Sequence, residues 1–376
     1  MSIYVVLLII LCNMTCWRAS KVLATLFAIE LGATQFHIGI LVALYSLFPM
    51  LLALYAGKLS DRMGVRLPMI AGSIGLSVGL TLPYFLPSIG ALYASAALIG
   101  GSHVFYNVSV QNLVGMLGGP ESRTRNFSNY GLIMSTGSFF GPLIAGFSID
   151  HFGHASSYLY IAGAPLISVM IILGARRLGL GRAKKNAEEE HGGHVRELLN
   201  NKPLRRTLLT GAVVLTGTDL FQFYMPIYGH SVGLTASAIG VVLAMFAAAS
   251  FVVRLVMPAL VKRWGADLVL TASLSIGAIS YLAFPWIADP RLLSTIAFFL
   301  GLSMGCGQPL TLMLIYDRAP RGRSGEAIGL RMTLNNFTHI VMPLFFGSLG
   351  TASGVAPVFV ANAFMLAGGG WISHRK

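Results

Sequence analysis

The chain has 376 residues, of which 55% are hydrophobic and only 10% are charged, and its mean hydropathy is +0.73. This small number of polar residues cannot cover that much apolar surface in a soluble globular protein. The composition therefore excludes a soluble globular protein and predicts an all-α membrane protein. Against 13 Asp and Glu stand 26 Lys and Arg, a formal net charge of +13. In a soluble protein that charge would indicate a nucleic-acid partner.

Twelve nearly uninterrupted apolar runs follow one another along the chain, each about 20 residues long and able to cross roughly 30 Å of hydrocarbon as a helix. Six precede the one long polar segment and six follow it. We therefore predict two six-helix bundles, residues 1–178 and 205–376, joined by a cytoplasmic linker of residues 179–204. The predicted transmembrane helices are 3–29, 36–57, 67–86, 91–117, 124–148, 156–178, 205–229, 236–258, 268–288, 292–316, 326–348 and 353–373.

The cations lie mostly in alternate loops or at the C-terminal end, and the opposite loops contain only Arg291. Outside the 176–206 cluster they are Lys58, Arg62, Arg66, Arg123, Arg125, Lys262, Arg263, Arg318, Arg321, Arg323, Arg375 and Lys376. This asymmetry predicts cytoplasmic termini in a bacterial inner membrane, and it explains the basic charge without nucleic acid. The first run lacks a basic n-region and is too long for a cleavable signal peptide.

Candidate metal ligands are few. Cys12 and Cys16 lie one helical turn apart, but we interpret all three Cys as small buried residues without a disulfide. The stretch "HGGH", residues 191–194, has two His without further ligands and is interpreted as a solvated loop. We predict neither a metal site nor a cofactor.

The two halves repeat one another at a constant offset of 201 residues, which places Gly32 on Gly233 and Gly39 on Gly240. The same offset relates Gly64 to Gly265, Pro142 to Pro343 and Gly146 to Gly347. Such a repeat favours two equivalent bundles related by an axis along the membrane normal, with a substrate site near the midplane between them.

The polar stretch "GKLSDRMGVRLPMI", residues 57–70, has the pattern G-x-x-x-D-R-x-G-x-R. Its residues are Gly57, Asp61, Arg62, Gly64 and Arg66. The pattern resembles the loop between helices 2 and 3 of major facilitator superfamily transporters. The resemblance implies a conformational latch in which Asp61 accepts hydrogen bonds from a helix N-terminus of the other bundle. Lys262 stands at the equivalent of Asp61 in the second half, so that copy of the motif is degenerate. The alternative is that Asp61, Arg62 and Arg66 are loop charges that only set the membrane topology.

A second stretch, "GSFFGPLIAG", includes Gly137, Gly141, Pro142 and Gly146. It is similar to the helix-5 motif of proton-coupled drug antiporters of the same superfamily, with Ala145 in place of one glycine. The similarity implies export by antiport, whereas close packing of small residues is the alternative explanation. The superfamily's helix-4 motif would place an Arg where this chain has Ala97.

Charges inside the apolar runs are the best guide to mechanism, because each costs about 2.5–3.5 kcal/mol at the centre of a membrane helix. Arg18 and Lys21 lie in the first helix, and the offset of 201 places Asp219 and Gln222 at the equivalent positions of the seventh. We expect Arg18 and Asp219 to face each other across the predicted substrate site between the two bundles, either as a structural ion pair or with Asp219 as the proton site. Lys21 has no obvious acidic mate, which indicates an anionic group on the substrate.

Two polar stripes with a spacing of four residues lie in otherwise apolar helices. The first contains His103, Asn107 and Gln111, the second Arg331, Asn335 and His339, and Gln308 is the repeat-equivalent of Asn107. They favour a hydrated path, although each His alone could be a satisfied buried residue and Arg331 could extend to the membrane surface. Aromatic residues such as Trp17, Tyr45 and Tyr130 could form an apolar wall of the site, but packing explains them equally well.

The sequence therefore predicts a monomeric secondary transporter working by alternating access, proton-coupled, that carries a small organic anion or acidic amphiphile, with export favoured. Proton-coupled uptake of an organic acid and multidrug efflux are the alternatives, and a non-transporting membrane receptor is the competing class. The chain has no Walker A sequence, no H-E-x-x-H and no paired intramembrane Asp, so we do not expect an enzyme. The expected partners are a small-molecule substrate, protons and the lipid bilayer.

Overall fold

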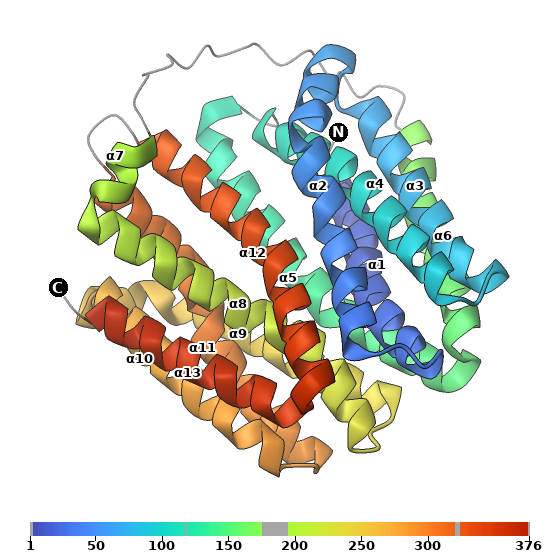
Figure 1. Ribbon diagram of the computed structural model, residues 1–376. Coiled ribbons are helices and arrows are strands. Elements are labelled where there is room, and N and C mark those ends of the chain that lie inside the picture. The colour runs from blue at the N-terminus through green and yellow to red at the C-terminus, as the bar shows by residue number, and fades with distance from the viewer. Residues whose placement is uncertain (1–2, 117–118, 175–194, 320–323, 375–376) are drawn as a thin grey trace. The chain divides into compact units, whose positions relative to one another are not determined.

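The computed structural model describes residues 3–116, 119–174, 195–319 and 324–374, and throughout these ranges the secondary structure is helical, without strands (Figure 1). Residues 175–194, which include most of the predicted linker and its "HGGH", lie outside the described residues. The described helices form two compact units.

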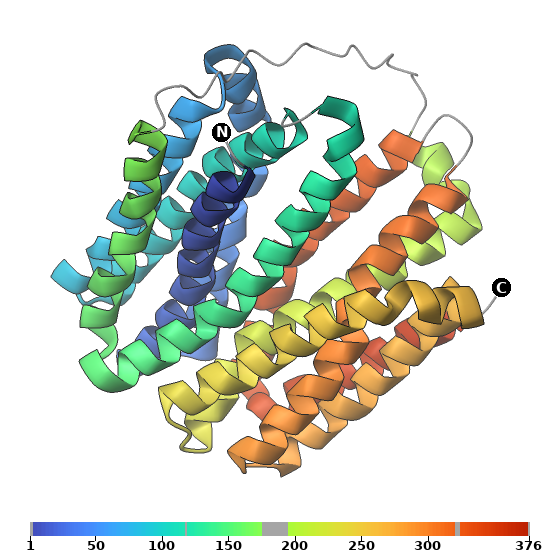
Figure 2. The same cartoon turned by 180° about the vertical axis from the view of Figure 1, so that it is seen from behind.

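Unit 1 contains the first six helices and the segment 233–244. The helices are α1 (Ile3–Glu30), α2 (Gln35–Met63), α3 (Arg66–Phe85), α4 (Ile89–Met116), α5 (Gly119–Phe152) and α6 (His154–Gly174). Within the unit, α4 packs against α2 and α3, and α1 packs against α5 and α6, as Figures 1 and 2 show from opposite sides. Small residues make these contacts close: a Cβ added at Gly100 would lie 2.8 Å from the carbonyl oxygen of Tyr45.

Unit 2 contains the remaining described helices from residue 195, apart from segment 233–244. They are α7 (Val195–Asn200), α8 (Lys202–Ser231), α9 (Ala236–Trp264), α10 (Ala266–Ala283), α11 (Pro290–Arg318), α12 (Ser324–Ser353) and α13 (Val355–His374), with a 3-10 turn at Phe284–Trp286. α10 packs against α11 and α13, and α8 packs against α11, α12 and α13. The short α7 ends the predicted linker, and its Leu198 is buried in a cluster with Leu204 and Ile315.

The predicted repeat appears in the backbone geometry. The described residues contain six glycines with positive φ, and they form three pairs at the offset of 201: Gly32 and Gly233, Gly64 and Gly265, Gly153 and Gly354. All have φ between 77° and 84°, a left-handed conformation that glycine adopts without a Cβ clash. Each pair stands at the same joint between helices in both halves.

Eleven of the described helices are long and apolar enough to cross a membrane. α12 coincides with the eleventh predicted span, 326–348, but is not among the eleven helices counted here, because its polar residues lower its mean hydropathy. The predicted all-α membrane fold is confirmed. The predicted domain boundaries at 178 and 205 stay a prediction. The compact units differ from the predicted bundles in that segment 233–244 belongs to unit 1.

Candidate functional site

Three of the predicted site residues meet around Trp17 in unit 1. The Trp17 and His103 rings are stacked, with centroids 4.4 Å apart and planes inclined by 12°. The Lys21 ammonium nitrogen lies 4.1 Å from the Trp17 ring centroid, and Cζ of Arg18 lies 4.9 Å from it. One indole thus contacts both intramembrane cations of α1 and the imidazole of α4, in the range of cation–π attraction.

Helical spacing and a glycine position this cluster, which we call the Trp17 cluster (Trp17, Arg18, Lys21 and His103). Trp17 and Lys21 are four residues apart and therefore share a face of α1. Tyr45 of α2 adds a second ring 5.7 Å from the Lys21 ammonium. On the side of α5, a Cβ at Gly141 would lie 2.5 Å from Cβ of Arg18, so the predicted helix-5 motif is what allows α5 to approach α1 here.

The first polar stripe does not act as one group. His103 belongs to the Trp17 cluster, whereas Asn107 accepts a 2.8 Å hydrogen bond from the Tyr130 hydroxyl of α5, and Gln111 is exposed. Sequence reasoning considered Tyr130 only as part of an apolar wall. Its polar role had a signal, because Tyr130 is the repeat-equivalent of Arg331.

The corresponding contact occurs in unit 2. Arg331 of α12 donates a 2.5 Å hydrogen bond to Oε1 of Gln308 in α11. Gln308 and Arg331 follow Asn107 and Tyr130 at the repeat offset, so the α11–α12 contact repeats the α4–α5 contact with an Arg in place of the Tyr. The structure therefore joins two predicted site residues that sequence reasoning had kept apart.

Asp219 is held by a residue that we did not predict as its partner. Nδ1 of His339 in α12 lies 2.5 Å from Oδ2 of Asp219 in α8, and both side chains are about two-thirds or more buried, at 34% and 28% exposure. Gln222 and Asn335, also predicted, are half-buried on the same two helices. Arg18 lies in unit 1 and Asp219 in unit 2, so their pairing stays a prediction.

The C-terminal end of α5 holds the start of α9 within unit 1. The two carboxylate oxygens of Asp150 accept hydrogen bonds from the backbone N–H of Ala236 (3.1 Å) and of Ser237 (2.8 Å). A Cβ at Gly240 would lie 2.5 Å from the carbonyl oxygen of Pro142, and one at Gly146 would overlap the carbonyl oxygen of Ala236. The helix-5 motif thus serves two close contacts, one with α1 and one with α9. Asp150 was missed because nothing in the sequence marks it as a cap of a distant helix.

The predicted latch is more helical than the sequence suggests. α2 continues to Met63, and the turn is made by Gly64, with φ 77°. Arg66 donates 3.3 Å hydrogen bonds to the carbonyl oxygens of Ile172 and Leu173 and so joins α3 to the end of α6. The positions of the side chains of Asp61 and Arg62, and the surroundings of Gly57, lie outside the described part.

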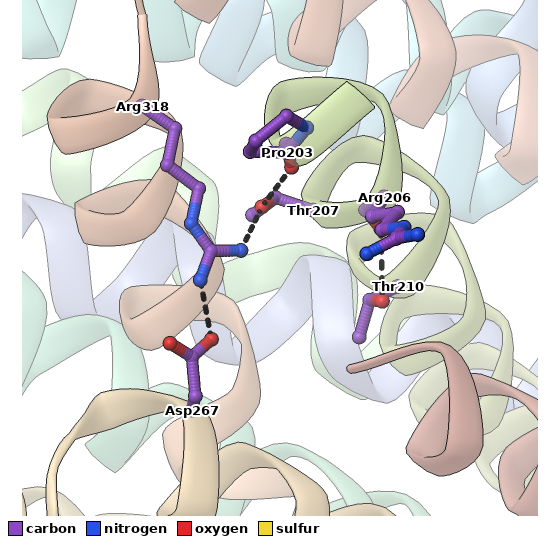
Figure 3. Close-up of polar contacts among 6 residues, drawn as sticks. All are labelled: Pro203, Arg206, Thr207, Thr210, Asp267 and Arg318. Atoms are coloured by element: carbon purple, nitrogen blue, oxygen red, sulfur yellow. Dashed lines mark hydrogen bonds and ion pairs between the residues drawn. The ribbon is translucent and has the colours of Figure 1, made fainter. Parts of the chain in front are cut away.

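The equivalent end of unit 2 has an ion pair that sequence reasoning also missed. Asp267, the repeat-equivalent of Arg66, lies 2.5 Å from Nη2 of Arg318, whose Nη1 donates a 2.6 Å hydrogen bond to the Thr207 hydroxyl (Figure 3). Three helices, α8, α10 and α11, are thereby joined through one guanidinium. Arg318 was interpreted only as a loop charge that sets topology.

Another cation inside a helix, Arg254 of α9, was not among the predicted site residues. Its Nε donates a 3.1 Å hydrogen bond to the carbonyl oxygen of Gly305 in α11.

Among the described residues no group of three or more His, Cys, Asp or Glu could hold a metal ion.

Two of the bacterial proteins that this chain is similar to are named as drug-resistance proteins. The tetracycline resistance protein, class H, of Pasteurella multocida is 23% identical over 321 residues, covering 82% of this chain and 78% of the relative. The multidrug resistance protein MdtG of Klebsiella pneumoniae (strain 342) is 21% identical, covering 86% and 80%.

The fold is shared with solved transporters. The crystal structure of the nucleoside transporter NupG superposes with a TM-score of 0.77 at 13% identity, covering 100% of both chains. That of a POT family transporter in complex with 5-aminolevulinic acid gives 0.78 at 12% identity, covering 98% of this chain and 94% of that one. A sequence profile of the Major Facilitator Superfamily matches residues 6–343, so this chain is an integral membrane protein that belongs to that superfamily of transporters.

Proposed function

We propose that this transporter exports a small organic anion or an acidic amphiphile across the bacterial inner membrane, in exchange for protons, by alternating access. The observation that carries the proposal is the Trp17 cluster, in which Arg18 and Lys21 contact one indole inside an apolar helix. Each cation costs about 2.5–3.5 kcal/mol in such a helix, so two on one turn favour a functional role. An acidic group on the substrate would offset that cost.

The Asp219–His339 pair is the proposed proton site. A carboxylate next to an imidazole can share one proton, and either group can release it when the surroundings change. Both lie in long helices of unit 2, away from the short turns between them. A proton bound here as substrate leaves would couple the two movements.

The proposed direction of transport follows from one motif and from the names of the relatives. The helix-5 motif and the names of the relatives, a tetracycline resistance protein and a multidrug resistance protein, favour export. The same names favour multidrug efflux as the second candidate. Proton-coupled uptake of an organic acid is the opposite direction of the same chemistry. We further propose that both termini face the cytoplasm and that the monomer is the working unit.

The deciding experiment uses the purified full chain in proteoliposomes with a pH-sensitive dye inside. A screen of organic acids should find some that move protons when added, and their labelled forms should accumulate against a gradient when a pH difference is imposed. Cationic drugs moving in place of acids would favour multidrug efflux. Binding without flux of any substrate would favour the receptor class and contradict the proposal.

A further inference from the structure

Two ring nitrogens of the Trp17 cluster have no hydrogen-bond partner among the described residues. They are Nε1 of Trp17 and Nδ1 of His103, and both atoms are buried. His103 as a whole is only 8% exposed. Buried polar side-chain atoms are partnered in the large majority of cases, so two such atoms on one pair of stacked rings require an explanation.

The surroundings restrict what kind of group could satisfy these nitrogens. The indole nitrogen can only donate, and the imidazole nitrogen donates in the tautomer that carries its proton at Nδ1. Lys21 and Arg18 lie against the same indole and make its surroundings positive. A group that accepts hydrogen bonds and carries negative charge fits both conditions, whereas an ammonium or an apolar group fits neither.

We infer that Trp17 and His103 are the specificity-determining residues for the acidic group of the substrate, donating hydrogen bonds to its oxyanion while Lys21 and Arg18 balance its charge. The inference rests on the proposed function, because it assigns the part of the site that distinguishes an acid from a neutral compound. Carboxylate and phosphate oxygens present the same acceptors, so the chemistry named is that of an oxyanion.

The chain allows a direct optical test, because it has four Trp. Trp264, Trp286 and Trp371 are 52%, 85% and 58% exposed, so changing all three to Phe should leave the helix packing in place and Trp17 as the sole indole. Benzoate, inorganic phosphate and benzyl alcohol are then titrated against the emission of the full-length variant in detergent. Benzyl alcohol matches benzoate in its ring but lacks the anion.

A saturable change in Trp17 emission with benzoate or phosphate, and none with benzyl alcohol, is expected, and the responding anion identifies the oxyanion. An equal response to benzyl alcohol, or no response to either anion, would overturn the inference. This readout does not depend on flux. An anion response in a protein that transports no anion would refute the proposed function and leave the binding site intact.

Substitutions separate hydrogen bonding from packing. Trp17→Phe keeps an aromatic ring but removes the N–H, and it should raise the KM of a transported anion about tenfold with little change in kcat. His103→Asn keeps a donor and should preserve more affinity than His103→Leu. Trp371→Phe is the matched control and should change nothing. An unchanged KM in Trp17→Phe, or equal loss in both His103 variants, would contradict the assignment.

Discussion

His339 holds Asp219: Nδ1 of the imidazole in α12 lies 2.5 Å from a carboxylate oxygen in α8. An acidic side chain inside a membrane protein is expensive to ionise without a partner, and the imidazole is a partner that can itself lose or gain a proton. The pair can therefore change its net charge by one without leaving a bare carboxylate.

Asp219→Asn should abolish substrate-driven proton movement, because the Asn amide does not bind or release a proton near neutral pH. Substrate binding should persist, as should exchange of labelled for unlabelled substrate, since exchange requires no net proton transfer. The measurement is the paired assay of dye response and exchange in proteoliposomes. Proton movement that survives the substitution would remove Asp219 from the mechanism. His339→Gln should weaken the pH dependence of transport without abolishing binding.

Gly141→Ala should lower the stability of the folded protein, whereas Gly131→Ala should not. Both glycines belong to α5, but an added Cβ at Gly141 meets Cβ of Arg18 at 2.5 Å, whereas nothing lies within 4 Å of one at Gly131. Overpacking of this kind costs about 1–3 kcal/mol. Thermal unfolding in detergent should show a lower midpoint for Gly141→Ala alone, together with reduced anion transport. Equal midpoints for the two variants would mean that α1 and α5 are not closely packed at Arg18.

Removing the carboxylate of Asp150 should loosen the start of α9, because two backbone N–H groups lose their acceptors. Replacing a helix-capping side chain by Ala costs about 0.5–2 kcal/mol. Asp150→Ala should therefore speed hydrogen exchange at Ala236 and Ser237. Thr34→Ala, which removes the side-chain cap of α2, is the matched control and should affect only the amides near His37. Unchanged exchange at the start of α9 would contradict the cap.

The Asp267–Arg318 pair should show measurable coupling in a double-mutant cycle. The two side chains are 49% and 26% exposed, so solvent screening limits the pair to about 0.2–1 kcal/mol. Arg318→Ala should cost more than Asp267→Ala, because the same guanidinium also donates to Thr207. The free energies come from denaturant unfolding of the four proteins. Strict additivity would show that the ion pair contributes nothing.

Much of the fold could be predicted because its causes are local. Apolar length identifies the spans, and the repeat offset placed equivalent turns in both halves, as the positive-φ glycines Gly32 and Gly233 confirm. The offset also related Asn107 to Gln308, and the structure gives both the same kind of partner, Tyr130 and Arg331.

The site was harder because its contacts join residues with no shared pattern. His339 is the repeat-equivalent of Ser138, so the offset said nothing about its contact with Asp219. The central position of Trp17 depends on which face of α1 meets α4, and aromatic residues look alike to hydropathy whether they fill a core or hold a cation. Only packing distinguishes these two roles.

The glycines with positive φ also mark turns at which the chain cannot gain or lose a residue. At Gly153 a single residue separates Phe152, the last of α5, from His154, the first of α6. One inserted residue would turn everything after it by about 100° if the helix absorbed it, and would carry buried side chains such as Tyr158 toward lipid. We therefore expect no insertions or deletions at these glycine turns between helices.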